Sequence, residues 1–277
     1  MKIWNRMRSH LRRRVVRCVP MSRVPLAMAL FLAWPHPTFA AETRADALLA
    51  LSDEIRHPGR SFRVEVELIE YHSGVAVSAM ALQVFARVEP GEDRAGSIVR
   101  FSTPAQDVGK LMLFQGRDLW FYDPESKASF RLSPQQRLMG QAANGDVLAV
   151  RLATDYDAAL VGRRTITDAS KAQRETDHLL LDAKTPQAIY ARIEYWQDAR
   201  TAEPVRARFY SDSGQLLKTA FYRRPLAALG RERPSEVLII DGINANLVTL
   251  MRYSNYAWQV VPAAWMQRDF LPRFREP

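Results

Sequence analysis

Few side chains in this sequence stand at spacings that catalysis or metal binding requires. His57, His72 and His178 are far apart, and none belongs to an HxH or HExxH pattern. The histidines therefore predict no cluster of metal ligands. The run DYD at 155–157 resembles a short DxD metal or sugar-nucleotide motif. A match of three residues arises too easily by chance to predict a site.

Nucleophilic catalysis finds no better support in the sequence. It contains no GxSxG elbow, no P-loop and no GxGxxG fingerprint. Ser52, Ser61 or Ser133 could attack a substrate only beside a base, and the sequence indicates none. We therefore predict that the protein is not an enzyme and uses neither a cofactor nor a metal. A hydrolase of unrecognised type, with Asp155 and Asp157 as its acids, is the alternative.

The first 40 residues differ in composition from the rest of the chain. Residues 1–23 contain eight Lys or Arg and no acidic residue, residues 24–34 are apolar, and two prolines precede a small residue, Ala40. This order is typical of a secretory signal peptide. The apolar run is much shorter than the roughly 20 residues of a spanning helix. We predict that 1–40 is a cleavable signal peptide. Both Met1 and Met21 are possible starts.

Cleavage after Ala40 changes the charge of the chain. The formal net charge falls from +9 to +1, because the leader carries eight basic residues and no acidic one. A near-neutral chain lacks the positive charge that phosphate binding needs, so we expect no nucleic-acid partner. Cys18 is the only cysteine and leaves with the leader, which excludes disulfides and a lipid-anchored cysteine. We predict a soluble monomer in the periplasm.

Hydrophobic periodicity predicts one mainly β domain over residues 41–277. Residues 45–56 carry apolar side chains at helical spacing. From residue 61 the period changes to two, and further strand-like runs separated by short turns continue to residue 253. Links this short join antiparallel neighbours. We expect roughly ten or eleven antiparallel strands, a few helices and a short C-terminal helix over 262–274.

Several of these strands are apolar on both faces, notably residues 111–114, 119–122 and 179–181. Both of their faces must therefore be covered, and a sheet of this length must curl or close. We predict a single, strongly curved antiparallel sheet with helices covering its concave face. A closed barrel with a filled interior is the alternative.

Met and aromatic side chains are frequent in the chain, and they line adaptable apolar sites as well as ordinary cores. An acyl chain needs no catalytic group, since each buried methylene contributes roughly 0.8 kcal/mol. A plain core is the alternative use of the same residues. The candidate cavity-lining residues are Phe62, Val64, Val66, Leu68, Met80, Leu82, Val84, Leu111, Leu113, Trp120 and Tyr122.

Residues 119–137, LWFYDPESKASFRLSPQQR, combine an aromatic strand, a proline turn and a second strand that ends before a polar loop. This region resembles the signature hairpin and loop of the LolA-like family of outer-membrane lipoprotein-sorting proteins. Residues 252–255 and 270–273 are also similar to that family. The matching positions of the hairpin are Trp120, Tyr122, Pro124, Arg131, Leu132, Ser133, Gln136 and Arg137.

The resemblance implies an open half-barrel whose helices close a cavity for acyl chains. It implies three partners: lipoprotein acyl chains or another lipid, an inner-membrane transporter of the ABC or RND type, and an outer-membrane acceptor. The implied function is a soluble periplasmic carrier that passes acyl chains from the transporter towards the outer membrane. The alternative is a periplasmic sensor or adaptor on the same fold that binds an inner-membrane signalling or transport partner.

The segment 133–147, SPQQRLMGQAANGDV, is polar and glycine-rich and has neither strand nor helix period. Its glycines and the Asn-Gly pair suit a bending segment. A carrier breaks no bond, so the chemical inertness of the segment is compatible with that function. We predict a rim or lid beside the cavity mouth. The lid candidates are Arg137, Leu138, Met139, Gly140, Asn144 and Gly145.

Overall fold

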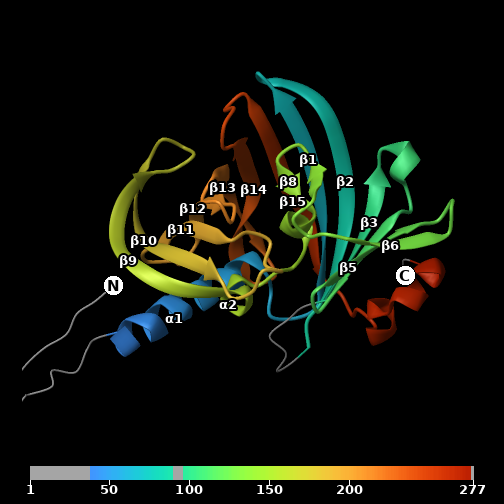
Figure 1. Ribbon diagram of the computed structural model, residues 1–277, viewed down its shortest axis with the longest axis horizontal. Coiled ribbons are helices and arrows are strands. Elements are labelled where there is room, and N and C mark those ends of the chain that lie inside the picture. Colours follow the sequence, from blue (N-terminus) through green and yellow to red (C-terminus); the bar gives the residue numbers. More distant parts are fainter. Residues whose placement is uncertain (1–37, 90–95, 276–277) are drawn as a thin grey trace, which may run out of the picture. The chain divides into compact units, whose positions relative to one another are not determined.

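The computed structural model describes residues 38–89 and 96–275, with side chains from residue 44 onward (Figure 1). The chain divides into two units, 1–36 and 37–277, and the described residues belong to the second. The predicted signal peptide lies almost wholly outside these residues, so its cleavage stays a prediction. None of the described helices is long and apolar enough to cross a bilayer.

Thirteen strands form one antiparallel sheet in the order β6-β5-β4-β3-β2-β1-β15-β14-β13-β12-β11-β10-β9. The edge strands β6 and β9 do not pair with each other, so the sheet is open. The predicted mainly β, antiparallel architecture is confirmed, and the closed-barrel alternative is wrong. The strands are β1 (Phe62–His72), β2 (Val75–Arg87), β3 (Gly96–Thr103), β4 (Leu111–Gln115), β5 (Asp118–Asp123), β6 (Ala128–Leu132), β9 (Tyr156–Thr167), β10 (Gln173–Ala183), β11 (Arg192–Asp198), β12 (Pro204–Tyr210), β13 (Leu216–Ala228), β14 (Arg231–Asp241) and β15 (Leu247–Trp258).

Strand β1 shows how side-chain alternation orients the sheet. Phe62, Val64 and Val66 are buried on the inner face. The charged residues between them point outward, where Glu67 forms an ion pair of 3.3 Å with Arg252 of the neighbouring β15. Because successive side chains of a strand point to opposite faces, this short pattern decides which side of β1 faces the core.

Helix α1 (Thr38–Arg56) packs against the inner part of the second half of the sheet, on β9, β12 and β14. The predicted helical stripe is present, since Ala45, Leu49, Ser52 and Ile55 are all buried. Ser52 also shares a hydrogen bond of 2.7 Å with the hydroxyl of Tyr195 on β11. The helix is longer at its N-terminal end than the periodicity predicted.

A segment between the two halves of the sheet fills much of the interior. In Figure 1 the hairpin β7 (Arg137–Met139) and β8 (Ala142–Ala143) lies between strands β9–β12 and strands β1–β3. The short helices η2 (Asn144–Val147) and α2 (Leu152–Asp155) continue it. We call residues 136–152 the plug segment. Most of its apolar side chains are buried in the main hydrophobic cluster.

The outer face of β2–β5 is covered by the C-terminal residues. In place of the predicted single helix there are two 3-10 helices, η3 (Ala263–Met266) and η4 (Arg268–Arg273). A further 3-10 helix, η1 (Ala105–Asp107), follows β3. Trp265 and Phe274 pack edge-on against Phe85 of β2, at ring-centroid distances of 5.5 and 5.9 Å. These residues form a second cluster separate from the interior.

Strand β9 was not predicted from the sequence. It is an edge strand whose side chains are mostly exposed, so it lacks a long alternating apolar pattern. Gly162, which has a positive φ of 133°, interrupts it at a register shift against His178 and Leu179. An irregular edge strand of this kind gives a weak periodic signal.

Candidate functional site

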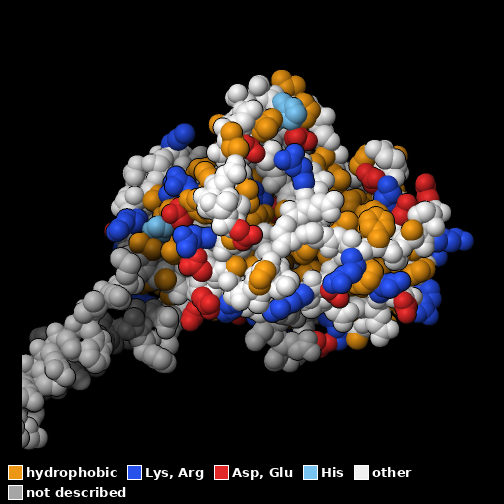
Figure 2. Space-filling model, in the orientation of Figure 1, with side chains coloured by type: hydrophobic (Ala, Val, Ile, Leu, Met, Phe, Trp, Pro, Cys, Tyr) orange, Lys and Arg blue, Asp and Glu red, His pale blue; other side chains and the backbone are white. Residues whose placement is uncertain are grey.

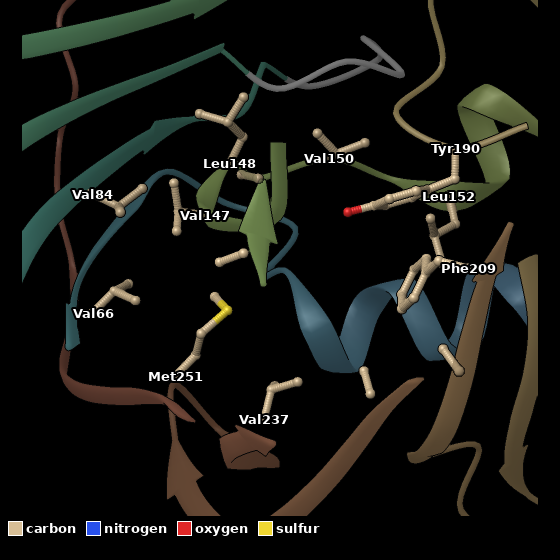
Figure 3. Packing of buried hydrophobic residues seen from close by; sticks show 14 of the residues in the cluster. Val66, Val84, Val147, Leu148, Val150, Leu152, Tyr190, Phe209, Val237 and Met251 are labelled. Carbon is tan, nitrogen blue, oxygen red and sulfur yellow. The ribbon is translucent and has the colours of Figure 1, made fainter. Parts of the chain in front are cut away.

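A cavity of about 90 Å³ lies between the concave face of the sheet, the end of α1 and the plug segment. Figure 3 shows Val66, Val84 and Met251 of the sheet facing Val147 and Leu148 of the plug segment. Most of the other side chains along this boundary are also apolar. The interior therefore combines a packed core with a small residual space, and that space is the candidate site.

The structure brings four of the eleven candidate residues to the wall of this cavity. They are Phe62, Val64 and Val66 of β1 and Val84 of β2. Three others belong to the same hydrophobic cluster without lining the space: Leu68 and Leu82 are fully buried, and Met80 is half-buried. Whether these residues contact a lipid stays a prediction.

Leu111, Leu113, Trp120 and Tyr122 do not lie at the cavity, which corrects the prediction for them. They belong to the outer cluster beneath the C-terminal 3-10 helices. On β4 it is the intervening residues, such as Met112, that point inward. Residues 111–114 of the strand are all apolar, so alternation could not tell its two faces apart.

The plug segment lies deeper than the predicted rim. Arg137 is exposed and Leu138 half-buried, whereas Met139, Gly140, Asn144 and Gly145 are buried. Both glycines are needed where they stand. A Cβ at Gly140, whose φ is 51°, would meet the hydroxyl of Thr249, and one at Gly145 would meet Ile189. The expected position at the rim is thus corrected, and the lid function stays a prediction.

One buried ion pair holds the plug segment against the sheet. Asp146 accepts hydrogen bonds from the Nζ of Lys218 on β13, from the Tyr190 hydroxyl at 2.8 Å and from the Ala143 N–H at 2.7 Å. The side chains of Lys218 and Asp146 are 5% and 14% exposed. Lys218 also donates to the carbonyl of Gln141 at 3.1 Å. The lysine thus crosslinks the plug segment at two points.

Burial lowers the pKa of Lys218, and the Asp146 carboxylate opposes that shift. Sequence reasoning did not single out either residue. The signal available was Lys218 itself, because Ala220, two positions along β13, is buried on the same face. A lysine in that register needs a buried partner.

Other polar contacts attach the plug segment at both ends. The Gln141 N–H donates to the Thr249 hydroxyl at 2.7 Å, and the Ala149 N–H donates to the Ser97 hydroxyl at 3.3 Å. Just before the segment, the Gln135 amide donates to the carbonyl of Ala188 at 2.7 Å. These contacts are to single groups of the sheet, and the plug segment does not join the thirteen-stranded ladder.

A polar group of residues stands where α1 ends at the cavity. Arg56, His57, Arg233, Tyr253 and Tyr256 all line it. Burial, with the positive charges of nearby arginines, lowers the pKa of His57 well below its ordinary value. His57 directly follows the last residue of α1, and its Nε2 is buried.

Two outer pockets adjoin the cavity. A pocket of about 470 Å³ beside the β10–β11 connection shares Ile189 and Tyr190 with it, and Gln135 lies on the same wall. A smaller pocket of about 100 Å³ shares Tyr222 and Arg233 with it. On the face seen in Figure 2, basic and acidic side chains are interspersed, so that face presents no charge field of one sign.

The fold thus combines an open, curved sheet with an internal, mostly apolar cavity. The described residues include no group of three or more His, Cys, Asp or Glu side chains placed to hold a metal ion. The DYD residues do not converge: Tyr156 is buried, whereas Asp157 is exposed. The class is that of an open-sheet protein with an internal apolar site.

Comparison with known proteins identifies the family. A LolA superfamily protein from Nitrosomonas europaea is 31% identical, with a TM-score of 0.73, over 82% of this chain and 98% of its own. A family model described only as an uncharacterized protein matches residues 93–273. The chain belongs to the LolA superfamily. No curated protein matches the sequence.

Two further solved structures share the fold. A proposed outer membrane lipoprotein-sorting protein domain from Vibrio parahaemolyticus is 16% identical, with a TM-score of 0.70, over 84% of this chain and 100% of its own. A DUF1329 family protein from Desulfovibrio piger is 18% identical, with a TM-score of 0.71, over 83% of this chain and 99% of its own. At these identities the likeness concerns the fold alone.

The buried ion pair leads to a stability prediction. Asp146→Asn leaves the Lys218 charge without its counter-ion, and we expect the free energy of unfolding to fall by about 3–5 kcal/mol. The double variant Asp146→Asn with Lys218→Met removes both charges and should recover most of that loss. Urea unfolding followed by tryptophan fluorescence measures both. A double variant as unstable as the single one would contradict the role assigned to the pair.

A pH prediction follows from His57. The folded protein keeps the imidazole neutral, while the unfolded chain protonates it with a pKa of about 6.5. Below that pH the unfolded state binds the extra proton, so stability is lost as the pH falls, by up to about 1.4 kcal/mol per pH unit. The variant His57→Gln should lack this component. Urea unfolding of both proteins between about pH 7 and 5 tests it, and parallel curves would refute it.

Proposed function

We propose that the protein is a periplasmic carrier that holds the acyl chains of a lipoprotein or another lipid in the interior of its half-barrel. It would receive them from an inner-membrane transporter and pass them towards the outer membrane. In this proposal residues 1–40 are the cleaved signal peptide and residues 41–277 act as one monomeric, non-enzymatic domain. Helix α1 and the plug segment cover the concave face.

The observation that carries the proposal is the apolar cavity enclosed between the sheet and the plug segment. Its wall comes from strands on both halves of the sheet, so a chain bound there would be surrounded by side chains. Burial of hydrocarbon needs shape and apolar surface and no reactive group. Membership of the LolA superfamily supports the same reading, since one solved relative of the fold is described in terms of lipoprotein sorting.

The size of the cavity bears on how cargo would be loaded. Its volume of about 90 Å³ falls well short of the roughly 300 Å³ or more of ordinary ligand sites. An acyl chain therefore fits only if something moves out of the interior. The plug segment is the best candidate, because it is attached through single polar contacts and the Lys218–Asp146 pair. The wall at Ile189 and Tyr190, beside the 470 Å³ pocket, would open with it.

A variant that fills the cavity tests the carrier function. Val64→Phe enlarges a side chain on the cavity wall, and we expect lipid recovered by solvent extraction of the purified mature protein to fall at least about tenfold. Overpacking should cost only about 1–3 kcal/mol of stability. The control Ile240→Phe enlarges a half-buried side chain of β14 in the outward register of that strand. It should keep its lipid.

The outcome that would contradict the carrier is wild-type protein that never contains lipid and binds no apolar fluorescent probe. A pull-down that recovers a signalling protein and no transporter would favour the sensor or adaptor instead. Thermal melts of both variants show whether a loss of lipid reflects a blocked cavity or a protein that has unfolded.

Loading should also change the dynamics of the plug segment. If it leaves the interior, its backbone N–H groups lose protection, so hydrogen exchange over residues 136–152 should accelerate at least about tenfold in lipid-loaded protein. Residues 111–115 of β4, which lie between two covered faces, serve as the internal control and should not change. Equal protection of the plug segment with and without lipid would mean that the cavity expands in some other way.

A further inference from the structure

Besides the Lys218–Asp146 pair, charged side chains line the cavity at the C-terminus of α1. Arg56 is the last residue of the helix, and Arg233 of β14 reaches the same place. Arg233 donates to the carbonyl oxygens of Glu54, at 2.9 Å, and Ile55, which lie in the last turn of α1. An arginine here satisfies carbonyls that the helix leaves unpaired. Both guanidinium groups are thereby fixed on the cavity wall.

The acidic groups nearby do not cancel this positive charge inside the cavity. Asp53 binds Arg56 at 3.0 Å and also accepts the Ala153 N–H at 2.8 Å. Glu54 is half-exposed and pairs with Arg231 and Arg151, at 3.3 and 3.6 Å, on the solvent side. One carboxylate thus faces two interior guanidinium groups. The low pKa of His57 has the charges of Arg56, Arg151 and Arg233 among its causes, after burial, as expected in a positive field.

One hydrogen-bonding group at this end lacks a partner. The Nε2 of His57 is buried without one. Tyr253 and Tyr256 line the cavity beside it. Burial raises the pKa of both, that of Tyr256 to about 12, so both hydroxyls stay protonated and can donate. Buried polar groups almost always find a partner, so the unpartnered Nε2 of His57 indicates a polar ligand at this end of the cavity.

The end of the cavity at α1 shares lining residues with an outer pocket. Tyr222, Arg233 and Pro234 belong both to the cavity and to the outer pocket of about 100 Å³. That pocket is polar, and Arg174 within it is paired with Asp198 at 2.8 Å. Arg233 therefore lies between the apolar interior and the polar outer pocket. A molecule lying across this border needs an apolar tail and a polar head.

We propose that the ligand of this cavity is an amphiphile with an anionic head group, a carboxylate or a phosphate, which Arg56 and Arg233 bind while its alkyl chain occupies the apolar interior. The inference rests on the proposed function, since it assumes that the cavity holds alkyl chains. Tyr253 and Tyr256 donate to the head group, and Arg is suited to both anions because its planar fork matches their oxygens.

Four ligands with one alkyl chain and different heads test the proposal: dodecanoate, dodecyl phosphate, dodecanol and dodecyltrimethylammonium. Calorimetric titration of the mature protein, below the micelle concentrations, should give affinities for the two anions at least about tenfold above that for dodecanol. The ammonium compound should bind most weakly. The ratio between dodecanoate and dodecyl phosphate distinguishes a fatty acid from a phosphate-bearing lipid.

Substitutions of Arg56 test whether the preference for an anionic head group arises at the end of α1. Arg56→Gln should lower the affinity for dodecanoate about tenfold or more, the loss of one charge-assisted hydrogen bond, and leave dodecanol binding unchanged. Arg56→Lys should recover part of the loss. The control Arg192→Gln removes one positive charge from an exposed pair with Asp182. It should bind all four ligands as the wild type does.

A second measurement uses the wild-type protein and therefore does not depend on whether a variant folds. Dodecanoate should raise the pKa of His57, followed by NMR of its ring protons, whereas dodecanol should not. Equal affinities for dodecanoate and dodecanol, with an unmoved His57, would overturn the head-group site and leave the carrier function standing. Failure of all four ligands to bind would instead overturn the carrier function itself.

Discussion

The concave face of an open sheet is the constraint on which this structure depends. Thirteen strands curve around an apolar surface that cannot remain in water, and no partner strand closes the gap between β6 and β9. Helix α1 and the plug segment both bury apolar side chains in the same hydrophobic cluster as the inward side chains of the sheet. The fit is incomplete, and the space left over is the cavity. The site is thus a consequence of how the sheet is filled.

The way the plug segment is held differs from the way the sheet is held. The strands share continuous ladders of backbone hydrogen bonds, whereas the plug segment relies on isolated contacts and on the Lys218–Asp146 pair. A buried ion pair adds little net stability, because desolvation offsets the attraction, but it strongly favours one arrangement over others. These isolated contacts fix the position of the plug segment with fewer hydrogen bonds than a strand of the sheet has.

The two faces of the sheet are lined differently. Outside, the C-terminal 3-10 helices cover β2–β5 and leave the interior untouched. Inside, the wall is mostly apolar, with the Lys218–Asp146 pair at the plug segment and the guanidinium groups of Arg56 and Arg233 where α1 ends. Arg233 caps the helix and faces the cavity with the same guanidinium group. One residue therefore links the placement of α1 to the chemistry of the site.

The sequence by itself determined the local features. Alternation oriented β1, the helical stripe placed α1, and the hairpin motif of residues 119–137 indicated the family that the comparison with a 31% identical relative established. Only the tertiary structure decided which face of the apolar run 111–114 in β4 points inward, how deep the plug segment lies, and that Asp146 meets Lys218, 72 positions away in the chain. Periodicity reports on neighbours within a strand or helix. Contacts between distant residues depend on register and curvature, which arise only when the whole sheet is assembled.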